Sequence, residues 1–370
     1  MLDNTAVSFF ELLKAGLWEQ RVQLSCRDAD IGGIYILAEQ QSVIGLVAAG
    51  FEYLDDSDFP SNAVFPFVGR VVTLEKRNTA MNSFIGLLVQ QLNNEGIKVL
   101  LLKGQGIAQC YERPMWRESG DVDFLLDENS FTAAKELLSQ RADRVLEDDP
   151  RRKHFAIQFG IWTVELHGTI HVHVSSRSDK ELDRLQAICM RRLGERTWID
   201  NGVIVPLPAP DEDVVYVFAH ILQHFYHSGI GLRQVCDWCR LLKMYSGELD
   251  AFLLEKRLRD MRFVSEWKTF AAFAVDYLGA PAEIIPLYSN NEKWSRKAVK
   301  VLKHILESGN MGHNLDCRFK DKYPFLVRKI ITLWLLTSAV FKRMIVFPAN
   351  SFFSWSLTIG TGLRRLFRSE

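Results

Sequence analysis

The pattern of apolar and polar positions predicts helices over the first 95 residues. Apolar residues recur with a period near 3.6, typical of amphipathic helices, in three segments: residues 9–17, 34–49 and 72–92. The last helix should end at Asn93-Asn94-Glu95-Gly96, because a glycine after the last apolar position is a common C-cap. Residues 55–62 interrupt the pattern and predict a loop.

The central part of the chain has the shorter period of β-strands. Apolar runs at residues 97–102 and 121–126 predict two strands, and alternation on both sides of Gly160 predicts a β-hairpin. A helix should begin at Asn129 or Ser130, since both residue types favour N-caps.

Three prolines between residues 206 and 210 predict a linker to a second helical region. The acidic residues 211–213 should begin its first helix, where the helix dipole favours negative charge. The predicted fold is therefore α+β, with a small mixed sheet flanked by helices, in three parts: a helical region at residues 1–95, an α/β core at 96–210 and a helical region at 211–370.

Composition excludes some classes of protein. The 370 residues are 48% hydrophobic and 24% charged, as in ordinary globular proteins with more than one domain. Lys+Arg and Asp+Glu both number 45, so no net charge favours binding to double-stranded nucleic acid. Six cysteines and the lack of an export signal predict reduced thiols and a cytoplasmic protein.

The last part of the chain leaves two alternatives open. Residues 330–341 are apolar but too few to span a bilayer. The aromatic tract at residues 352–355 precedes Arg364, Arg365 and Arg368, a combination that suits peripheral contact with a membrane surface. A buried pair of C-terminal helices is the alternative.

Asp121, Asp123 and Glu165 are the leading candidates for chemistry. Asp121 and Asp123 are two residues apart in a predicted strand, so both face one side of it. Two such carboxylates repel each other when ionised unless a cation lies between them. Glu165 is placed in a neighbouring predicted strand, and three carboxylates can hold Mg²⁺. An ordinary strand with a polar outer face gives the same spacing.

A glycine-containing turn follows the first predicted strand. Lys103-Gly104-Gln105-Gly106 allows backbone N–H groups to approach a phosphate. Lys103 and Arg117 add positive charges that would neutralise a triphosphate. The stretch from Lys103 to Asp123 therefore predicts a phosphate-handling site.

Three segments resemble the uncharacterised nucleotidyltransferase family of bacteria, a branch of the polymerase-β-like nucleotidyltransferase superfamily. They are Leu101-Leu102-Lys103-Gly104, Arg117-Glu118-Ser119-Gly120-Asp121-Val122-Asp123-Phe124-Leu125 and Val164-Glu165-Leu166-His167. The resemblance covers roughly residues 15–245 and includes the downstream residues His220, His224, Arg233 and Asp237. The serine that usually follows the first strand in the superfamily is absent.

The resemblance implies transfer of a nucleoside monophosphate from a nucleoside triphosphate to the hydroxyl of an unknown acceptor. Asp121, Asp123 and Glu165 would bind two Mg²⁺ ions, or Mn²⁺, and Glu165 would help to activate the acceptor. The implied nucleotide contacts are Lys103, Gly104, Gly106, Arg117 and Gly120. The implied substrate pocket contains His167, His220, His224, Arg233 and Asp237.

Other hypotheses remain. The same fold could be a non-catalytic nucleotide- or glycan-binding module, for example in surface-polysaccharide assembly. A zinc site is conceivable from four residues, His220, His224, Cys236 and Cys239. A cupin-like metal cluster is conceivable from His167, His171 and His173, which alternate as along a strand. Arg233 and Asp237 have the i,i+4 spacing of a helical ion pair.

Overall fold

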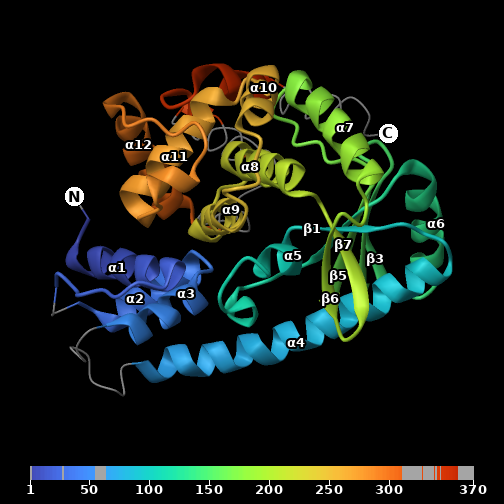
Figure 1. Cartoon of the computed structure of the whole chain (residues 1–370), viewed down its shortest axis with the longest axis horizontal. Coiled ribbons are helices and arrows are strands. Elements are labelled where there is room, and N and C mark those ends of the chain that lie inside the picture. Colours follow the sequence, from blue (N-terminus) through green and yellow to red (C-terminus); the bar gives the residue numbers. More distant parts are fainter. Residues whose placement is uncertain are drawn as a thin grey trace.

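A computed structural model describes residues 2–26, 29–54, 64–310, 327, 337, 340–341 and 343–356 of the chain. It confirms the predicted α+β fold, in which helices surround a small mixed sheet (Figure 1). The helices are α1 (Asn4–Trp18), α2 (Ile31–Gln40), α3 (Ile44–Gly50), α4 (Phe65–Asn94), α5 (Gly104–Ala108), α6 (Glu128–Ser139), α7 (Ser176–Arg191), α8 (Pro210–His227), α9 (Leu232–Met244), α10 (Ala251–Met261), α11 (Val264–Leu278) and α12 (Glu292–Ser308). The strands are β1 (Leu100–Leu102), β2 (Val122–Leu125), β3 (Arg144–Asp149), β4 (His154–Phe159), β5 (Trp162–His167), β6 (Arg196–Asp200) and β7 (Val203–Leu207).

The main sheet has the order β1-β2-β5-β4-β3. β2 and β5 are parallel, whereas the other neighbouring strands are antiparallel. The hairpin β4–β5 turns at Gly160, whose φ of 56° suits glycine, and this confirms the predicted hairpin. Val122, Phe124 and Leu126 pack into one core cluster, so the odd-numbered Asp123 faces the other side of the sheet.

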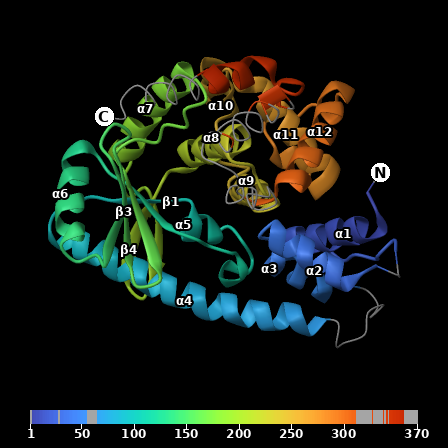
Figure 2. The same ribbon diagram turned by 180° about the vertical axis from the view of Figure 1, so that it is seen from behind.

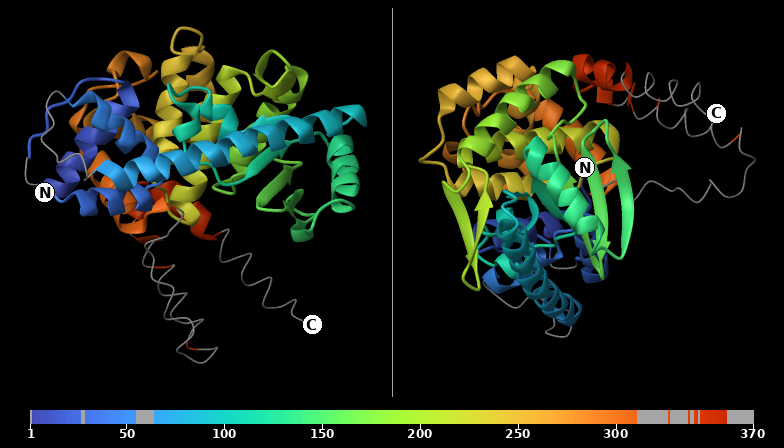
Figure 3. Two further views of the ribbon diagram at one scale, coloured as in Figure 1. Left: turned by 90° about the horizontal axis from the view of Figure 1, so that it is seen from below. Right: turned by 90° about the vertical axis from the view of Figure 1, so that its right-hand side faces the viewer.

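Helix α4 connects the two hydrophobic cores. Its first turns bury Phe67 and Leu74 among the N-terminal helices, whereas later turns bury Ile85 and Leu92 against the sheet and α6. Figure 3 shows this helix running along the length of the molecule when seen from below. The predicted long helix is thus confirmed, and its C-terminal glycine, Gly96, has a φ of 71°.

The N-terminal helices α1 to α3 share one hydrophobic core with helices α8 to α12, and α1 packs against α11, although the two sets are distant in sequence (Figure 2). Arg240 of α9 makes the link specific, because its Nη1 donates to the carbonyl oxygen of Leu17 at 2.8 Å and to Glu19. Their buried residues belong to one cluster. The three-part division of the chain stays a prediction.

Some predicted element boundaries differ. Residues 34–49 form two helices, α2 and α3, because the chain leaves the helical path at Ser42, whose φ is 54°. Helix α6 is capped by Asp127, whose side chain accepts from Ser130 N, so the predicted cap at Asn129 or Ser130 is wrong. An aspartate one turn earlier can satisfy the same free N–H groups.

The predicted proline linker is wrong. Pro206 lies in β7, which among the described strands pairs only with β6, so the missing proline N–H costs no bond to a further described strand. Pro210 is the first residue of α8, a position that favours proline. The β6–β7 hairpin packs against β1 and α4, and its residue Leu207 belongs to the sheet core.

The predicted loop at residues 55–62 lies entirely outside the described residues. Most of the C-terminal tail, including Arg364, Arg365 and Arg368, also lies outside them. Within the tract at residues 352–355, Phe352 and Phe353 are exposed. Among the helices that the structure describes, none is long and apolar enough to cross a membrane.

The contact between α1 and α3 depends on a close backbone approach. An alanine at Gly50 would place its Cβ 2.1 Å from the carbonyl oxygen of Leu12. We expect Gly50→Ala to lower the free energy of unfolding by about 1–3 kcal/mol, as overpacking does. Thermal unfolding monitored by circular dichroism would measure this.

Gly69→Ala is the matched control. Its Cβ would meet nothing within 4 Å in α4, so the higher helix propensity of alanine should stabilise the protein by up to about 1 kcal/mol. Equal melting temperatures for both variants would contradict the close packing.

Candidate functional site

Three neighbouring strands bring the predicted carboxylates together. In the sheet register, Asp123 of β2 lies beside Leu102 of β1 and beside Glu165 of β5. Asp121 immediately precedes β2. Ligand oxygens of Asp121, Asp123 and Glu165 all lie within 4.8 Å of one another. Parallel pairing of β2 with β5, which are distant in sequence, therefore creates the three-carboxylate cluster.

These carboxylates repel one another. The negative charge of Asp123, followed by burial, raises the pKa of Asp121. For Asp123 itself, burial acts to raise the pKa, but Lys103 and a hydrogen bond from His167 lower it overall. The cluster is therefore a place where added positive charge is stabilising.

Lys103 supplies one such charge from the end of β1. Its Nζ lies 3.1 Å from Asp123 Oδ1, and its side chain is 16% exposed. Burial acts to lower the pKa of Lys103, but the neighbouring groups, with Asp123 first and Tyr216, Asp121 and Glu165 after it, together raise it, so the ammonium stays charged. The backbone of Lys103 has φ 50° and ψ −141°, a conformation that non-glycine residues rarely adopt.

A histidine from β5 supplies the second charge. His167 Nε2 lies 2.8 Å from Asp123 Oδ1 and 3.5 Å from Glu165 Oε2. Burial acts to lower the pKa of His167, but its hydrogen bonds to Asp123 and Glu165 raise it to about 9. His154 of β4 approaches the same Glu165 oxygen at 3.2 Å.

Helix α8 forms the opposite wall with two histidines. A lysine ammonium can only donate, so Lys103 Nζ donates to His220 Nε2 at 3.1 Å. His224 Nε2 lies 3.2 Å from His220 Nε2, and its Nδ1 lies 2.9 Å from Ser228 Oγ. Burial and the charge of Lys103 lower the pKa of both histidines, to about 4 for His224.

The predicted pair of Arg233 with Asp237 does not form. Asp237 instead binds Arg117, whose Nε and Nη2 donate to its two oxygens at 2.7 Å each. Both side chains are 6% exposed, so this bidentate bond ties α9 to the segment before β2. Arg233 donates from Nη1 to the carbonyl oxygen of Glu118, while its buried Nε has no partner.

These groups line one cavity of about 550 Å³ between the sheet and helices α8 and α9. Among the predicted residues that line it are Lys103, Gly104, Arg117, Gly120, Asp121, Asp123, Glu165, His167, His220, His224, Arg233 and Asp237. The remaining one, Gly106, is buried elsewhere, and a Cβ there would approach Leu207 of β7 at 2.8 Å. Gly106 therefore allows close packing of β7, and its predicted phosphate contact has no geometric support.

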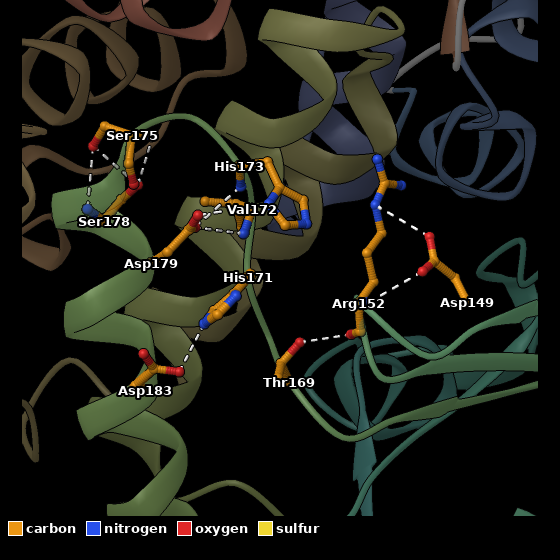
Figure 4. A network of polar contacts seen from close by, with 10 residues as sticks. All are labelled: Asp149, Arg152, Thr169, His171, Val172, His173, Ser175, Ser178, Asp179 and Asp183. Atoms are coloured by element: carbon orange, nitrogen blue, oxygen red, sulfur yellow. Dashed lines mark hydrogen bonds and ion pairs between the residues drawn. The ribbon is translucent and has the colours of Figure 1, made fainter. Parts of the chain in front are cut away.

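An irregular segment after β5 forms another side of this cavity (Figure 4). Asp179 Oδ1 of α7 accepts from the backbone N–H groups of Val172 and His173, at 3.1 and 3.0 Å. His171 Nε2 lies 2.7 Å from Asp183 Oδ1. The predicted strand-like alternation of His167, His171 and His173 is wrong, because β5 ends at His167 and α7 anchors the irregular segment.

The two histidine-based hypotheses do not match the structure. Cys236 and Cys239 are fully buried in the helical core, whereas His220 and His224 face the cavity. Within the described residues, the groups that could hold a metal ion are Asp121, Asp123 and Glu165, and His154, Glu165 and His167. Neither the zinc set nor the cupin-like set is therefore assembled.

Sequence reasoning missed His154, Glu147 and Tyr216, which also line the cavity. A signal for His154 exists in the predicted hairpin. A two-residue turn after Phe159 pairs the strands residue by residue and places His154 opposite His167. Glu147 lies in β3 and Tyr216 in α8, and the sequence does not show which face of either element is turned toward the cavity.

A family model described as uncharacterised nucleotidyltransferase matches residues 27–279, more than half of the chain. The chain belongs to this nucleotidyltransferase family. The match includes every residue of the cavity described above and confirms the resemblance found in the sequence. No curated protein and no solved structure matches the chain.

The donor set of this cavity fits a divalent cation. Hard cations such as Mg²⁺ prefer carboxylate oxygens, and three carboxylates meet here. Their mutual repulsion raises the pKa of Asp121, with Asp123 as its largest cause, and a bound cation would relieve that repulsion. Asp121, Asp123 and Glu165 are therefore the residues that could hold the metal.

The neutral histidine wall predicts a pH dependence. The pKa of His224 is lowered to about 4 by burial and by Lys103, whereas an exposed histidine titrates near 6.5. Below about pH 6.5 the unfolded chain binds a proton that the folded protein excludes, so stability falls as the pH decreases toward 4. We expect His224→Gln to reduce this loss, by on the order of 2 kcal/mol.

Melting temperatures of wild type and His224→Gln between pH 7.5 and 4.5 would measure the effect. The difference between the two melting temperatures should be smallest at pH 7.5 and largest at pH 4.5. Parallel curves would show that His224 is protonated equally in the folded and unfolded states.

Proposed function

We propose that this protein transfers a nucleoside monophosphate from a nucleoside triphosphate to an acceptor hydroxyl, with Mg²⁺ as the metal and Mn²⁺ as an alternative. The observation that carries the proposal is the cluster of Asp121, Asp123 and Glu165 beside Lys103 in the cavity. Membership of a nucleotidyltransferase family supports the reaction class. Use of a hydroxyl acceptor, and peripheral contact of the C-terminal tail with a membrane surface, are parts of this proposal.

Bound divalent cations would offset the charge of the triphosphate and of the phosphoryl group as it transfers. Asp121, Asp123 and Glu165 would hold these cations at the sheet surface. An acceptor oxygen forms the new bond to the α-phosphorus, and the bond to the β-phosphate oxygen breaks, releasing pyrophosphate. Burial acts to raise the pKa of Glu165, but its hydrogen bonds with His154 and His167 lower it overall, so Glu165 is ionised and accepts the proton of the acceptor hydroxyl.

Lys103 and Arg233 offer positive charge to the triphosphate in this cavity. Lys103 reaches the carboxylate cluster from β1, and Arg233 lies in the same cavity with an unpartnered Nε. Arg117 is held by Asp237 instead, and its Nη1 also donates to Ser119 Oγ at 2.8 Å. Arg117 therefore positions the segment that carries Asp121. The phosphate contact expected of Arg117 is made by Arg233 instead.

The carboxylate cluster gives the direct test of activity. Asp121→Asn and Asp123→Asn should lower product formation at least about a hundredfold, since metal-held charge stabilisation contributes several kcal/mol. Each of the four nucleoside triphosphates is incubated with Mg²⁺ and a library of hydroxyl acceptors. Mass spectrometry then detects acceptors that gain one nucleoside monophosphate, and pyrophosphate release gives the rate.

Asp148→Asn is the control, because Asp148 pairs with Lys135 on the exposed face of β3 and lies outside the cavity. Turnover that is the same in Asp121→Asn, Asp123→Asn and wild type would sink the assignment. Tight nucleotide binding with no product for any acceptor would favour a non-catalytic binding module.

Arg233 gives a second test. Arg233→Ala should raise the KM for the triphosphate about tenfold or more, because a charged hydrogen bond contributes about 1.5–3 kcal/mol. Arg233→Lys should recover part of the loss. The control is Arg184→Ala on the exposed surface of α7, where only Glu181 pairs with it. A KM that is unchanged in Arg233→Ala would exclude this contact.

A further inference from the structure

We propose that His154, Glu165 and His167 form a second metal site, which takes a transition-metal dication such as Zn²⁺. The β4–β5 register places His154 directly opposite His167, with ring centroids 5.1 Å apart. Glu165 lies two residues before His167 and shares its face of the sheet. The three ligand atoms all lie within 4.8 Å of one another.

The distances converge on one oxygen atom. Glu165 Oε2 is 3.2 Å from His154 Nε2 and 3.5 Å from His167 Nε2. Nitrogen atoms of two imidazoles and one carboxylate oxygen therefore lie close enough together to ligate one ion. This arrangement rests on a tight hairpin with regular pairing from Phe159–Trp162 back to His154–His167, so the backbone holds the donors rigidly.

The donor types separate this site from the carboxylate cluster. Mg²⁺ prefers oxygen ligands, whereas imidazole suits borderline ions such as Zn²⁺. Two histidines and one carboxylate form the ligand set of many catalytic zinc sites, which keep further positions open for water or substrate. Asp121 and Asp123 add only oxygens, so the two donor sets differ in metal preference.

Access and outer contacts also suit a ligating role. The side chains of His154, Glu165 and His167 are 18%, 26% and 15% exposed, and all three line the cavity. On the other side of the His154 ring, Glu147 Oε2 lies 3.7 Å from Nδ1. Metal-bound histidines commonly have a carboxylate near the nitrogen that does not bind the metal.

The second site adjoins the first. Glu165 belongs to both donor sets, and His167 Nε2 lies 2.8 Å from Asp123 Oδ1. In the metal-free protein, the imidazole of His167 is the positive partner of the Asp123 and Glu165 carboxylates. A dication on the two histidines would take over that role, with loss of the proton shared between His167 and Asp123.

Metal titration without nucleotide tests the site. The full chain is treated with a chelator, dialysed, and titrated separately with ZnCl₂ and MgCl₂ by isothermal titration calorimetry. We expect one equivalent of Zn²⁺ to bind at least about a hundredfold more tightly than Mg²⁺. His154→Ala should weaken Zn²⁺ at least about tenfold and change Mg²⁺ affinity by a much smaller factor.

Two controls separate the donor sets. Asp121→Asn should weaken Mg²⁺ and leave Zn²⁺ affinity within about twofold, the reverse of His154→Ala. His171→Ala, a histidine of the same cavity outside the set, should change neither affinity. Co²⁺ in place of Zn²⁺ should give a visible absorption band that is lost in His154→Ala.

Several results would overturn the proposal. They are Zn²⁺ affinity that is equal in wild type and His154→Ala, equal weakening by His171→Ala, or no preference for Zn²⁺ over Mg²⁺. If His167→Ala fails to fold because it leaves Asp123 unpaired, His154→Ala still decides the question. Since nucleotide is absent, failure of nucleotidyl transfer would not remove Zn²⁺ binding, and the two proposals can fail separately.

Discussion

The ion pair between Lys103 and Asp123 is the interaction on which the site depends. Three carboxylates within 4.8 Å repel one another in a partly buried place, and Lys103 Nζ at 3.1 Å from Asp123 offsets that repulsion. His167 adds a second positive partner for the same oxygen. The strands β1, β2 and β5 must therefore keep their register, because Lys103 follows β1, Asp123 lies in β2 and His167 lies in β5.

A second buried pair extends this constraint to the helices. Arg117 and Asp237 join the segment before β2 to α9, and breaking such a pair costs several kcal/mol because it leaves a buried charge. Helix α8 contributes His220, whose ring nitrogen accepts from Lys103. The C-terminal helices are thus one wall of the cavity, and the sheet alone would leave its carboxylates open to water.

Local patterns were enough to find the centre of the site. The spacing of Asp121 and Asp123 and the position of Glu165 follow from strand periodicity, and the structure places all three together. The partners of Arg117 and Asp237 could not be found in this way. An i,i+4 spacing favoured Arg233 for Asp237, but the guanidinium of Arg117 reaches both oxygens of that carboxylate from another part of the chain.

The sequence by itself determined the α+β class, the long helix α4, the β4–β5 hairpin and the shared face of Asp121 and Asp123, because periodicity and turn residues act over a few neighbouring positions. Tertiary structure decided which cation pairs with which carboxylate, that Gly106 packs against Leu207, and that His154 joins Glu165 and His167. These contacts join residues distant in sequence or on separate strands, and their energies arise only when packing excludes water from them.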